Sequence, residues 1–409
     1  MPNIIRVALS LTFFITVHAI AQVEPTDTLL GRADGKLYLL EDKRVKNETT
    51  DAINALYNFD FDKADLEFRY LEVKYPDHPL PTFLLGLMQW WKIMPNTEDE
   101  QFDERFFELM SQSIDKAQKL WDQDEGNLEA AFFLSGGYGF RGRLHADRKN
   151  WRKAINDGRA ALKWLNVSKG KEKFSREFLF GDALFNYYRV YIHDNLPLLR
   201  PILAFFPKGS KELGLQQLTR VTLEAFYTRT EAQTYLMRIY ANEEGNPSKS
   251  IQVSEYLNHT FPNNPYFERT HARNLYLLGQ LSECFILSED LYKKCEAHQF
   301  GYEANSLRLA SYFLGYIQMR RFGDKPKAIS YFEKSIESGD KANQQSSGYT
   351  LFAHVYAAQL YEQLGNLEKA TALMQEVKKR ADRKEAAYQD ADKWLDSHAP
   401  KRKKFLGIF

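Results

Sequence analysis

Cysteine is the scarcest residue type in this 409-residue chain, which contains only two, Cys284 and Cys295. We expect both on one helix covering about residues 281–296, where their sequence separation places them roughly 16 Å apart along the helix axis. A disulfide needs Cα atoms within about 7 Å of each other. This placement excludes a bridge between the two, so the fold must rest on its hydrophobic core.

The chain also lacks an excess of charge of either sign, since its formal net charge is +1. A neutral chain gives no electrostatic basis for binding nucleic acid, so we predict no nucleic-acid partner. The histidines are scattered, with neither an H-E-x-x-H pair nor cysteines at zinc spacing. Phosphate-loop, kinase and G-x-S-x-G motifs are missing too. We therefore predict no catalytic, cofactor-binding or metal-binding residues.

Three glycines have the spacing of a nucleotide-binding loop. Gly137, Gly139 and Gly142 spell G-x-G-x-x-G, which in dinucleotide-binding proteins follows a buried strand. Here the preceding segment, LEAAFFLS, has the pattern of an amphipathic helix. We therefore predict that these glycines lie on a helix and let a neighbouring helix approach closely.

Long apolar runs are confined to the N-terminus. Arg6 precedes the run VALSLTFFITV, and Ala19-Ile20-Ala21 offers a small-x-small cleavage site. The run is about half the length that a membrane span requires, so we predict a signal peptide over residues 1–21, cleaved before Gln22. No cysteine stands near that site, which argues against a lipoprotein. The expected location is periplasmic or outer-membrane associated.

Aromatic residues are abundant: the chain has 23 Tyr and 29 Phe, and 44% of its residues are hydrophobic. This composition suits stacked amphipathic helices, whose layers need large side chains to fill the gaps between them. A helix is expected to begin at Thr97-Glu98-Asp99-Glu100 and to run through Trp121, because acidic residues favour helix N-termini.

A repeat supports the helical interpretation. Gly245-Asn246 and Gly279-Gln280 are turn dipeptides 34 residues apart, and each is followed at fixed offsets by small and apolar residues on one helix face. Related turns are Phe59-Asp60, Lys149-Asn150, Gly323-Asp324 and Gly365-Asn366. The small residues five positions after the first turn residue are Ala64, Ala154, Ser250, Cys284, Ala328 and Ala370.

These segments, among them YEQLGNLEKATALMQEV (361–377), resemble the tetratricopeptide-repeat (TPR) family. The spacing departs from the family period between Cys284 and Ala370, and the expected tryptophan and tyrosine of the first helix are mostly absent. Residues 130–295 are also similar to exported bacterial TPR proteins of undefined role and, faintly, to the eukaryotic inclusion-body-clearance TPR family. The resemblance implies an all-α solenoid of antiparallel helix pairs and a binding or adaptor role without catalysis.

An apolar segment broken by prolines interrupts the repeats at residues 195–210 (NLPLLRPILAFFPKGS). We expect an N-terminal degenerate region over 22–194, this insert, a C-terminal TPR array over 211–398 and a basic tail over 399–409. Two interpretations of the insert stay open. It either folds back over the groove or the junction, or it exposes apolar side chains such as Phe205 and Phe206 to a membrane or a partner.

The expected function is that of an exported scaffold or adaptor that binds a protein or peptide partner in its concave groove. The alternative is a carbohydrate-binding TPR protein of the outer-membrane glycan-uptake type, which the missing lipoprotein cysteine disfavours. Arg141 and Arg143 are two residues apart, so only one of them can face the groove; the tyrosines are either groove residues or core residues. The candidate partner-binding residues are Arg141, Arg143, Asn186, Tyr187, Tyr188, Tyr191, Phe205 and Phe206.

Overall fold

The computed structural model describes residues 38–195, 197, 200–203 and 206–399. Over these residues the chain forms helices and no strands, which confirms the predicted all-α fold. The predicted signal peptide with its cleavage site, Phe205, and all but the first residue of the basic tail lie outside the described residues. No helix in the described part of the chain is long and apolar enough to cross a membrane.

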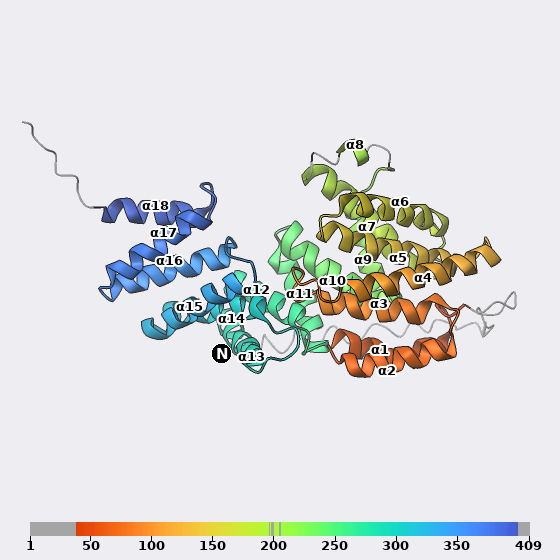
Figure 1. Cartoon of the computed structure of the whole chain (residues 1–409), viewed down its shortest axis with the longest axis horizontal. Coiled ribbons are helices and arrows are strands. Elements are labelled where there is room, and N and C mark those ends of the chain that lie inside the picture. The colour runs from red at the N-terminus through yellow and green to blue at the C-terminus, as the bar shows by residue number, and fades with distance from the viewer. Residues whose placement is uncertain (1–37, 196, 198–199, 204–205, 400–409) are drawn as a thin grey trace, which may run out of the picture.

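The helices form antiparallel pairs that follow one another along the solenoid (Figure 1). The N-terminal pairs are α1 (Lys43–Tyr57) with α2 (Phe61–Lys74), α3 (Pro79–Ile93) with α4 (Asp103–Gln123), α5 (Leu128–Asp147) with α6 (Trp151–Ser168), and α7 (Phe178–Asn195) with α9 (Lys211–Glu224). The C-terminal pairs are α10 (Arg229–Arg238) with α11 (Pro247–Thr260), α12 (Pro265–Leu277) with α13 (Leu281–Glu296), α14 (Ala304–Ile317) with α15 (Lys325–Lys341), and α16 (Gly348–Gln363) with α17 (Leu367–Arg380). The helix α18 (Ala386–His398) covers the last pair.

All six predicted turn positions adopt the left-handed conformation. Gly245, Gly279, Gly323 and Gly365 have φ between 57° and 81°, and Phe59 and Lys149 have φ of 64° and 59°. In each case the next residue is the N-cap of the second helix of a pair. Before Gly245 and Gly323 the first helix widens into short π-helical turns, η2 (Ile239–Glu243) and η3 (Gln318–Phe322). Glycine adopts this conformation without strain, whereas a side chain there costs free energy.

The predicted small residues pack against the preceding helix. The five residues Ala64, Ser250, Cys284, Ala328 and Ala370 are completely buried, and Ala154 is half-buried. Cys284 and Cys295 both lie on α13 as buried free thiols, as predicted.

Two pairs lie outside the predicted turns, α3 with α4 and α7 with α9, and in the second the insert displaces the turn. Gly214, Leu218 and Val221 of α9 are buried at the same four- and seven-residue offsets as in the predicted repeats. A side chain at Gly214 would meet the backbone nitrogen of Tyr187 at 2.7 Å, so only glycine permits this contact between α7 and α9. The insert 195–210, with the four-residue helix α8 (Arg200–Leu203), therefore connects the two helices of one pair rather than two separate arrays.

The predicted start of the helix at Thr97 is wrong, since α4 begins at Asp103. Thr97 to Gln101 form turns instead. Arg148, at the end of α5, holds these turns in place: its guanidinium donates to the carbonyl oxygens of Thr97 and Asp99 and pairs with the carboxylate of Asp103, at 2.5 and 2.8 Å. This long-range contact outweighs the local preference of acidic residues for a helix start.

The glycine pattern lies within α5, as predicted. A side chain at Gly142 would lie 3.4 Å from backbone atoms of α6, and one at Gly137 would meet Ile114 of α4 at 2.7 Å. Both glycines therefore allow close helix packing. Gly139 differs, because a Cβ there would meet nothing within 4 Å.

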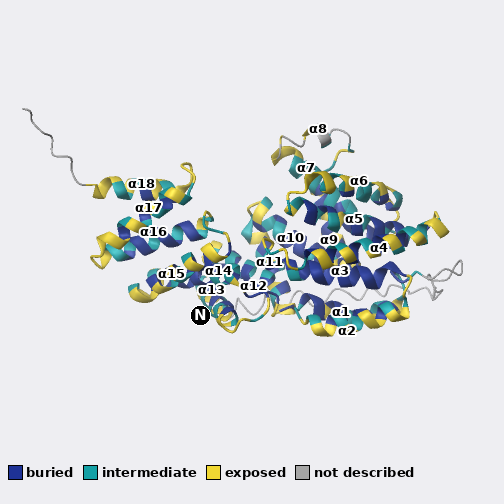
Figure 2. Ribbon diagram, viewed as in Figure 1, coloured by how far each residue is buried: buried dark blue, intermediate teal, exposed yellow. Residues whose placement is uncertain are grey.

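The N-terminal part of the solenoid curls back until its first pairs contact the later ones. The Asn264 side chain, before α12, donates to the carbonyl oxygen of Tyr57 at 2.8 Å, and buried Arg269 donates to that of Pro95 at 2.8 Å. Phe300, after α13, packs against the rings of Phe59 and Phe61. These contacts close a superhelical turn, and Figure 2 shows α3 within it as buried along nearly its whole length.

The left-handed turns give the first test. Lys149 and Gly365 occupy the same place in two repeats, but only the lysine is strained there. We expect Lys149→Gly to raise the free energy of unfolding by up to about 1 kcal/mol and Gly365→Ala to lower it by about 1 kcal/mol. Urea denaturation measures the free energy of unfolding of the two variants. Changes in the same direction for both would contradict the strain that we assign to Lys149.

Candidate functional site in the closed superhelical turn

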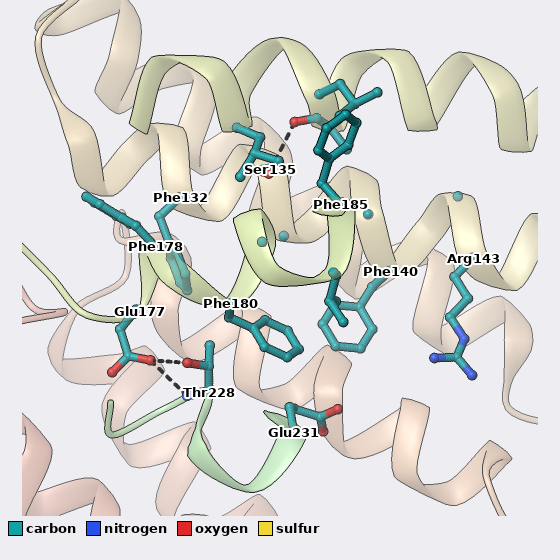
Figure 3. A pocket seen from close by; sticks show the side chains of 18 of the residues that line it. Phe132, Ser135, Phe140, Arg143, Glu177, Phe178, Phe180, Phe185, Thr228 and Glu231 are labelled. Carbon is teal, nitrogen blue, oxygen red and sulfur yellow. Dashed lines mark hydrogen bonds between the residues drawn. The ribbon is translucent and has the colours of Figure 1, made fainter. Parts of the chain in front are cut away.

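The closed turn surrounds a cavity of about 470 Å³. The first helices α3, α5, α7 and α10 contribute most of its wall, α6 closes one side, and Leu203 and Phe206 of the insert reach it from the segment after α7. Figure 3 shows the phenylalanine side chains that line this space. Apolar lining residues on α3, α5, α6 and α7 include Phe83, Phe132, Phe133, Phe140, Phe178, Phe180, Phe185, Leu84, Leu87, Leu162, Leu165 and Leu184.

Small residues on α5 and α6 create this space. Gly139, Gly158 and Ala161 face the cavity, and a Cβ added at either glycine would meet nothing within 4 Å. The cavity is partly open to solvent, so its apolar walls stay in contact with water unless a ligand covers them, which is unfavourable. Water is a poor occupant of apolar walls. The cavity therefore has the character of a ligand site rather than of a packing defect.

A buried carboxylate at one end of the cavity holds the superhelical turn closed. One carboxylate oxygen of Glu231, on α10, accepts hydrogen bonds from Trp91 Nε1 at 2.7 Å and from Tyr57 Oη at 3.2 Å. Tyr57 lies on α1 and Trp91 on α3, 174 and 140 residues away from Glu231 in sequence. Burial raises the pKa of Glu231. This contact joins three first helices that do not follow one another in the chain.

A second buried carboxylate, Glu177, acts as the cap of α10. It accepts hydrogen bonds from the backbone N–H groups of Phe226, Tyr227 and Thr228 at 2.7, 3.1 and 2.8 Å, and from the Thr228 hydroxyl at 2.6 Å. A carboxylate held by four donors at a helix N-terminus is structural. Figure 3 shows Glu177 beside Thr228, and both Glu177 and Glu231 accept their hydrogen bonds from groups of the protein itself.

Arginines and tyrosines form an alternating stack beside the cavity. Arg143 lies over the rings of Trp90 and Tyr235, with its carbon Cζ 4.8 and 5.5 Å from the ring centroids. Arg238 lies over Tyr235 and Tyr188, at 4.9 and 5.6 Å. Arg143 also lines a second, smaller pocket of about 210 Å³, together with Arg238 and Arg269. It therefore stands between an apolar and a polar space.

The structure separates the predicted site residues into two groups. Arg143, Tyr188 and Phe206 line the cavity. The others make structural contacts: Arg141 forms a two-pronged ion pair with Asp157 at 2.7 and 2.8 Å, and Asn186 donates to Gln217 at 2.8 Å. The two arginines thus point to different neighbours, as their spacing predicts.

The remaining tyrosines belong mainly to the α7 packing. Tyr187 is completely buried and donates to Glu244 at 2.5 Å, and burial raises its pKa. Half-buried Tyr191 stacks on Tyr187 and lies under the ammonium group of Lys211. A binding role for these residues stays a prediction.

Sequence reasoning missed Glu231, Tyr235 and the phenylalanines of α5 and α7. One signal pointed to the cavity: in the repeat frame at Lys149-Asn150 all three positions, Ala154, Gly158 and Ala161, are small, whereas every other repeat has at least one larger side chain at the second or third position. A helix with three small residues on its inner face leaves space. Among the described residues no cluster of His, Cys, Asp or Glu could hold a metal ion.

Outside the closed turn, the C-terminal pairs present a row of tyrosines on their first helices. Tyr276 lies on α12, Tyr312 and Tyr316 on α14, and Tyr349 and Tyr356 on α16. Their rings pack in sequence, with Tyr276 and Tyr312 at a centroid distance of 5.7 Å and Tyr316 and Tyr356 at 5.8 Å. All but Tyr312 are half-buried. We call these five residues the tyrosine row.

Glu231 supplies a pH-dependent test. Because its folded pKa is raised, the folded chain binds a proton that the unfolded chain releases near pH 4.3. The stability this gives is present below that pH and is lost as the pH rises toward the folded pKa. The variant Glu231→Gln keeps an acceptor but does not titrate. We expect its stability relative to the native chain to increase from pH 4 to pH 7 in urea denaturation.

A companion variant separates titration from hydrogen bonding. Glu231→Ala leaves Trp91 Nε1 and Tyr57 Oη without an acceptor, which costs about 1–3 kcal/mol for each group. This loss is expected at every pH. A pH-independent difference between Glu231→Gln and the native chain would contradict the raised pKa.

The comparisons with known proteins do not identify a family for this chain. No protein-family model and no curated protein matches the sequence. Among solved structures, yeast Tom70 is similar over 77% of this chain at 11% identity, with a TM-score of 0.37, and the chain spans 63% of Tom70. The TPR domain of P58(IPK) is similar over 88% of this chain and 100% of its own length, at 12% identity and a TM-score of 0.23. The chain's own paired helices, left-handed turns and buried small residues make it an all-α solenoid of antiparallel helix pairs.

Proposed function

We propose that this chain is an exported scaffold or adaptor protein that binds an extended segment of a protein partner and performs no catalysis. The tyrosine row is the observation that supports the proposal. First helices of neighbouring pairs pack on one another from α12 through α18, which makes them the inner, concave side of the C-terminal solenoid. Repeat solenoids use this side for binding.

The chemistry of the row suits a peptide. A tyrosine offers a large ring surface at a low cost in conformational entropy, and its hydroxyl can exchange hydrogen bonds with a backbone. Tyr276 Oη and Tyr312 Oη lie 3.1 Å apart, and Arg273 Nε donates to Tyr349 Oη at 3.3 Å. A groove with such alternating apolar and polar contacts recognises an extended chain.

The absence of catalysis is supported by the roles of the buried acidic groups. Glu177 caps a helix, and Glu231 holds helices together. Glu268, on α12, is a further buried carboxyl group: burial raises its pKa to about 7, and it accepts from Tyr302 Oη at 2.6 Å and pairs with Lys294 at 2.8 Å. A carboxylate paired in this way joins helices and is not free to act on a substrate.

A second candidate ligand for the tyrosine row is a carbohydrate. Half-exposed aromatic rings stack on sugars as well as on peptides, so the row also fits the glycan-uptake alternative. Export, and a periplasmic or outer-membrane location, enter the proposal from the sequence of residues 1–21 alone. Contact of residues 195–210 with a membrane is likewise a prediction from sequence.

The test uses the mature chain as bait in an envelope extract. We expect Tyr316→Ala combined with Tyr356→Ala to reduce recovery of a protein partner by roughly tenfold, because central aromatic residues dominate binding at interfaces. Tyr70→Ala, on the outer helix α2 where Tyr70 is 64% exposed, is the matched control and should change nothing.

Hydrogen exchange locates the contact. A bound partner should slow amide exchange in α14 and α16 of the native chain and not in the double variant. A glycan array with the same proteins decides between the two ligands. Glycan binding that needs Tyr316 and Tyr356, without any protein partner, would overturn the scaffold proposal.

A further inference from the structure

We propose that the cavity in the closed turn is a binding site for a single amphiphile with a long apolar chain and an acidic head group, such as a long-chain fatty acid. The chain would lie among the phenylalanines of α3, α5 and α7, and the head group would lie beside Arg189. This site is distinct from the tyrosine row and does not depend on the function proposed for it.

The dimensions and walls of the cavity select an apolar ligand. Its volume of about 470 Å³ falls within the roughly 300–1,000 Å³ typical of small-molecule sites, which are mostly apolar with a few polar groups that fix orientation. An extended peptide would need an open groove with accessible hydrogen-bonding groups. Here the first helices of the closed turn present phenylalanine and leucine side chains instead.

Arg189 selects the acidic head group. It lies on α7 and lines the cavity, and its Nη2 donates to the carbonyl oxygen of Leu203 at 2.8 Å. Its Nε is buried and has no hydrogen-bond partner, and no ion pair involves Arg189 among the residues that the structure describes. A cation without a counter-charge beside an apolar wall is costly, and a ligand carboxylate would both neutralise it and accept its free N–H.

Arg143 and Glu231, which also line the cavity, are less suited than Arg189 to bind an acidic head group. Glu231 lies close to Arg143, whose charge acts on the carboxyl group. Arg143 is also placed 3.9 Å from Asp147, and its guanidinium donates to Tyr235. An acidic head group at this end would meet Glu231. The head group is therefore assigned to Arg189, which lines the cavity together with Leu203 and Phe206 of the insert and donates to the Leu203 carbonyl oxygen.

Two glycines allow the cavity to be filled without disturbing the fold. Gly139 on α5 and Gly158 on α6 both line the cavity and have open space at the Cβ position. Replacing a helical glycine also raises helix propensity. Gly139→Leu and Gly158→Leu should therefore fold at least as stably as the native chain while occupying the space of the ligand. Exposed Gly348, at the start of α16, has the same open space outside the cavity and gives the matched control Gly348→Leu.

The experiment measures displacement of a fluorescent fatty-acid probe by oleic acid and by oleyl alcohol, with unfolding temperatures recorded for every variant. We expect the native chain and Gly348→Leu to bind the probe at one saturable site. Gly139→Leu and Gly158→Leu should weaken binding of both compounds at least tenfold with no loss of thermal stability.

The head-group assignment has its own variant. Arg189→Gln should weaken binding of oleic acid about tenfold and leave oleyl alcohol unchanged, because only the carboxylate uses the guanidinium charge. Equal losses for the two compounds would overturn the head-group assignment. No saturable binding by the native chain, or binding that survives both cavity-filling substitutions in folded protein, would overturn the site itself. None of these outcomes depends on whether the tyrosine row binds a protein.

Discussion

The structure depends on one buried contact, in which Glu231 accepts hydrogen bonds from Tyr57 and Trp91. A solenoid normally contacts only its nearest repeats, so its curvature is the sum of many small rotations. Here a carboxylate on α10 joins α1 and α3 across most of the N-terminal half. Asn264 and Arg269 add hydrogen bonds to backbone carbonyls at the same junction. Together they convert an open superhelix into a closed turn.

Closure divides the inner surface of the solenoid into two chemical environments. Within the turn, first helices face one another across a short distance, and their aromatic side chains surround an apolar cavity. Beyond α12 the pairs no longer meet their distant neighbours, and the first helices present half-buried tyrosines. The same type of helix pair therefore produces a partly enclosed apolar cavity in one half and an accessible polar–aromatic surface in the other. Arg143 lies at the boundary, in contact with both spaces.

The insert lines the cavity because it connects α7 with α9. Gly214 lets α9 pack closely against the backbone of α7, as the small residues of the other repeats do for their own helix pairs. The pair is therefore intact, and residues 195–210 form an enlarged connection within it. Because that connection leaves α7 at the cavity, Leu203 and Phe206 become part of the cavity wall.

Local patterns in the sequence determined six of the helix pairs, their left-handed turns and the small residues at which each second helix packs on the first, because these features depend on residues within one repeat. They also placed both cysteines and the glycine-rich helix. The binding surfaces were decided only by the tertiary structure. Tyr57, Trp91 and Glu231 carry no shared local signal, and Tyr187 and Tyr188 are adjacent in sequence, yet one is core and the other lines the cavity. The closing of the turn depends on contacts across more than a hundred residues, which no periodicity within a single repeat encodes.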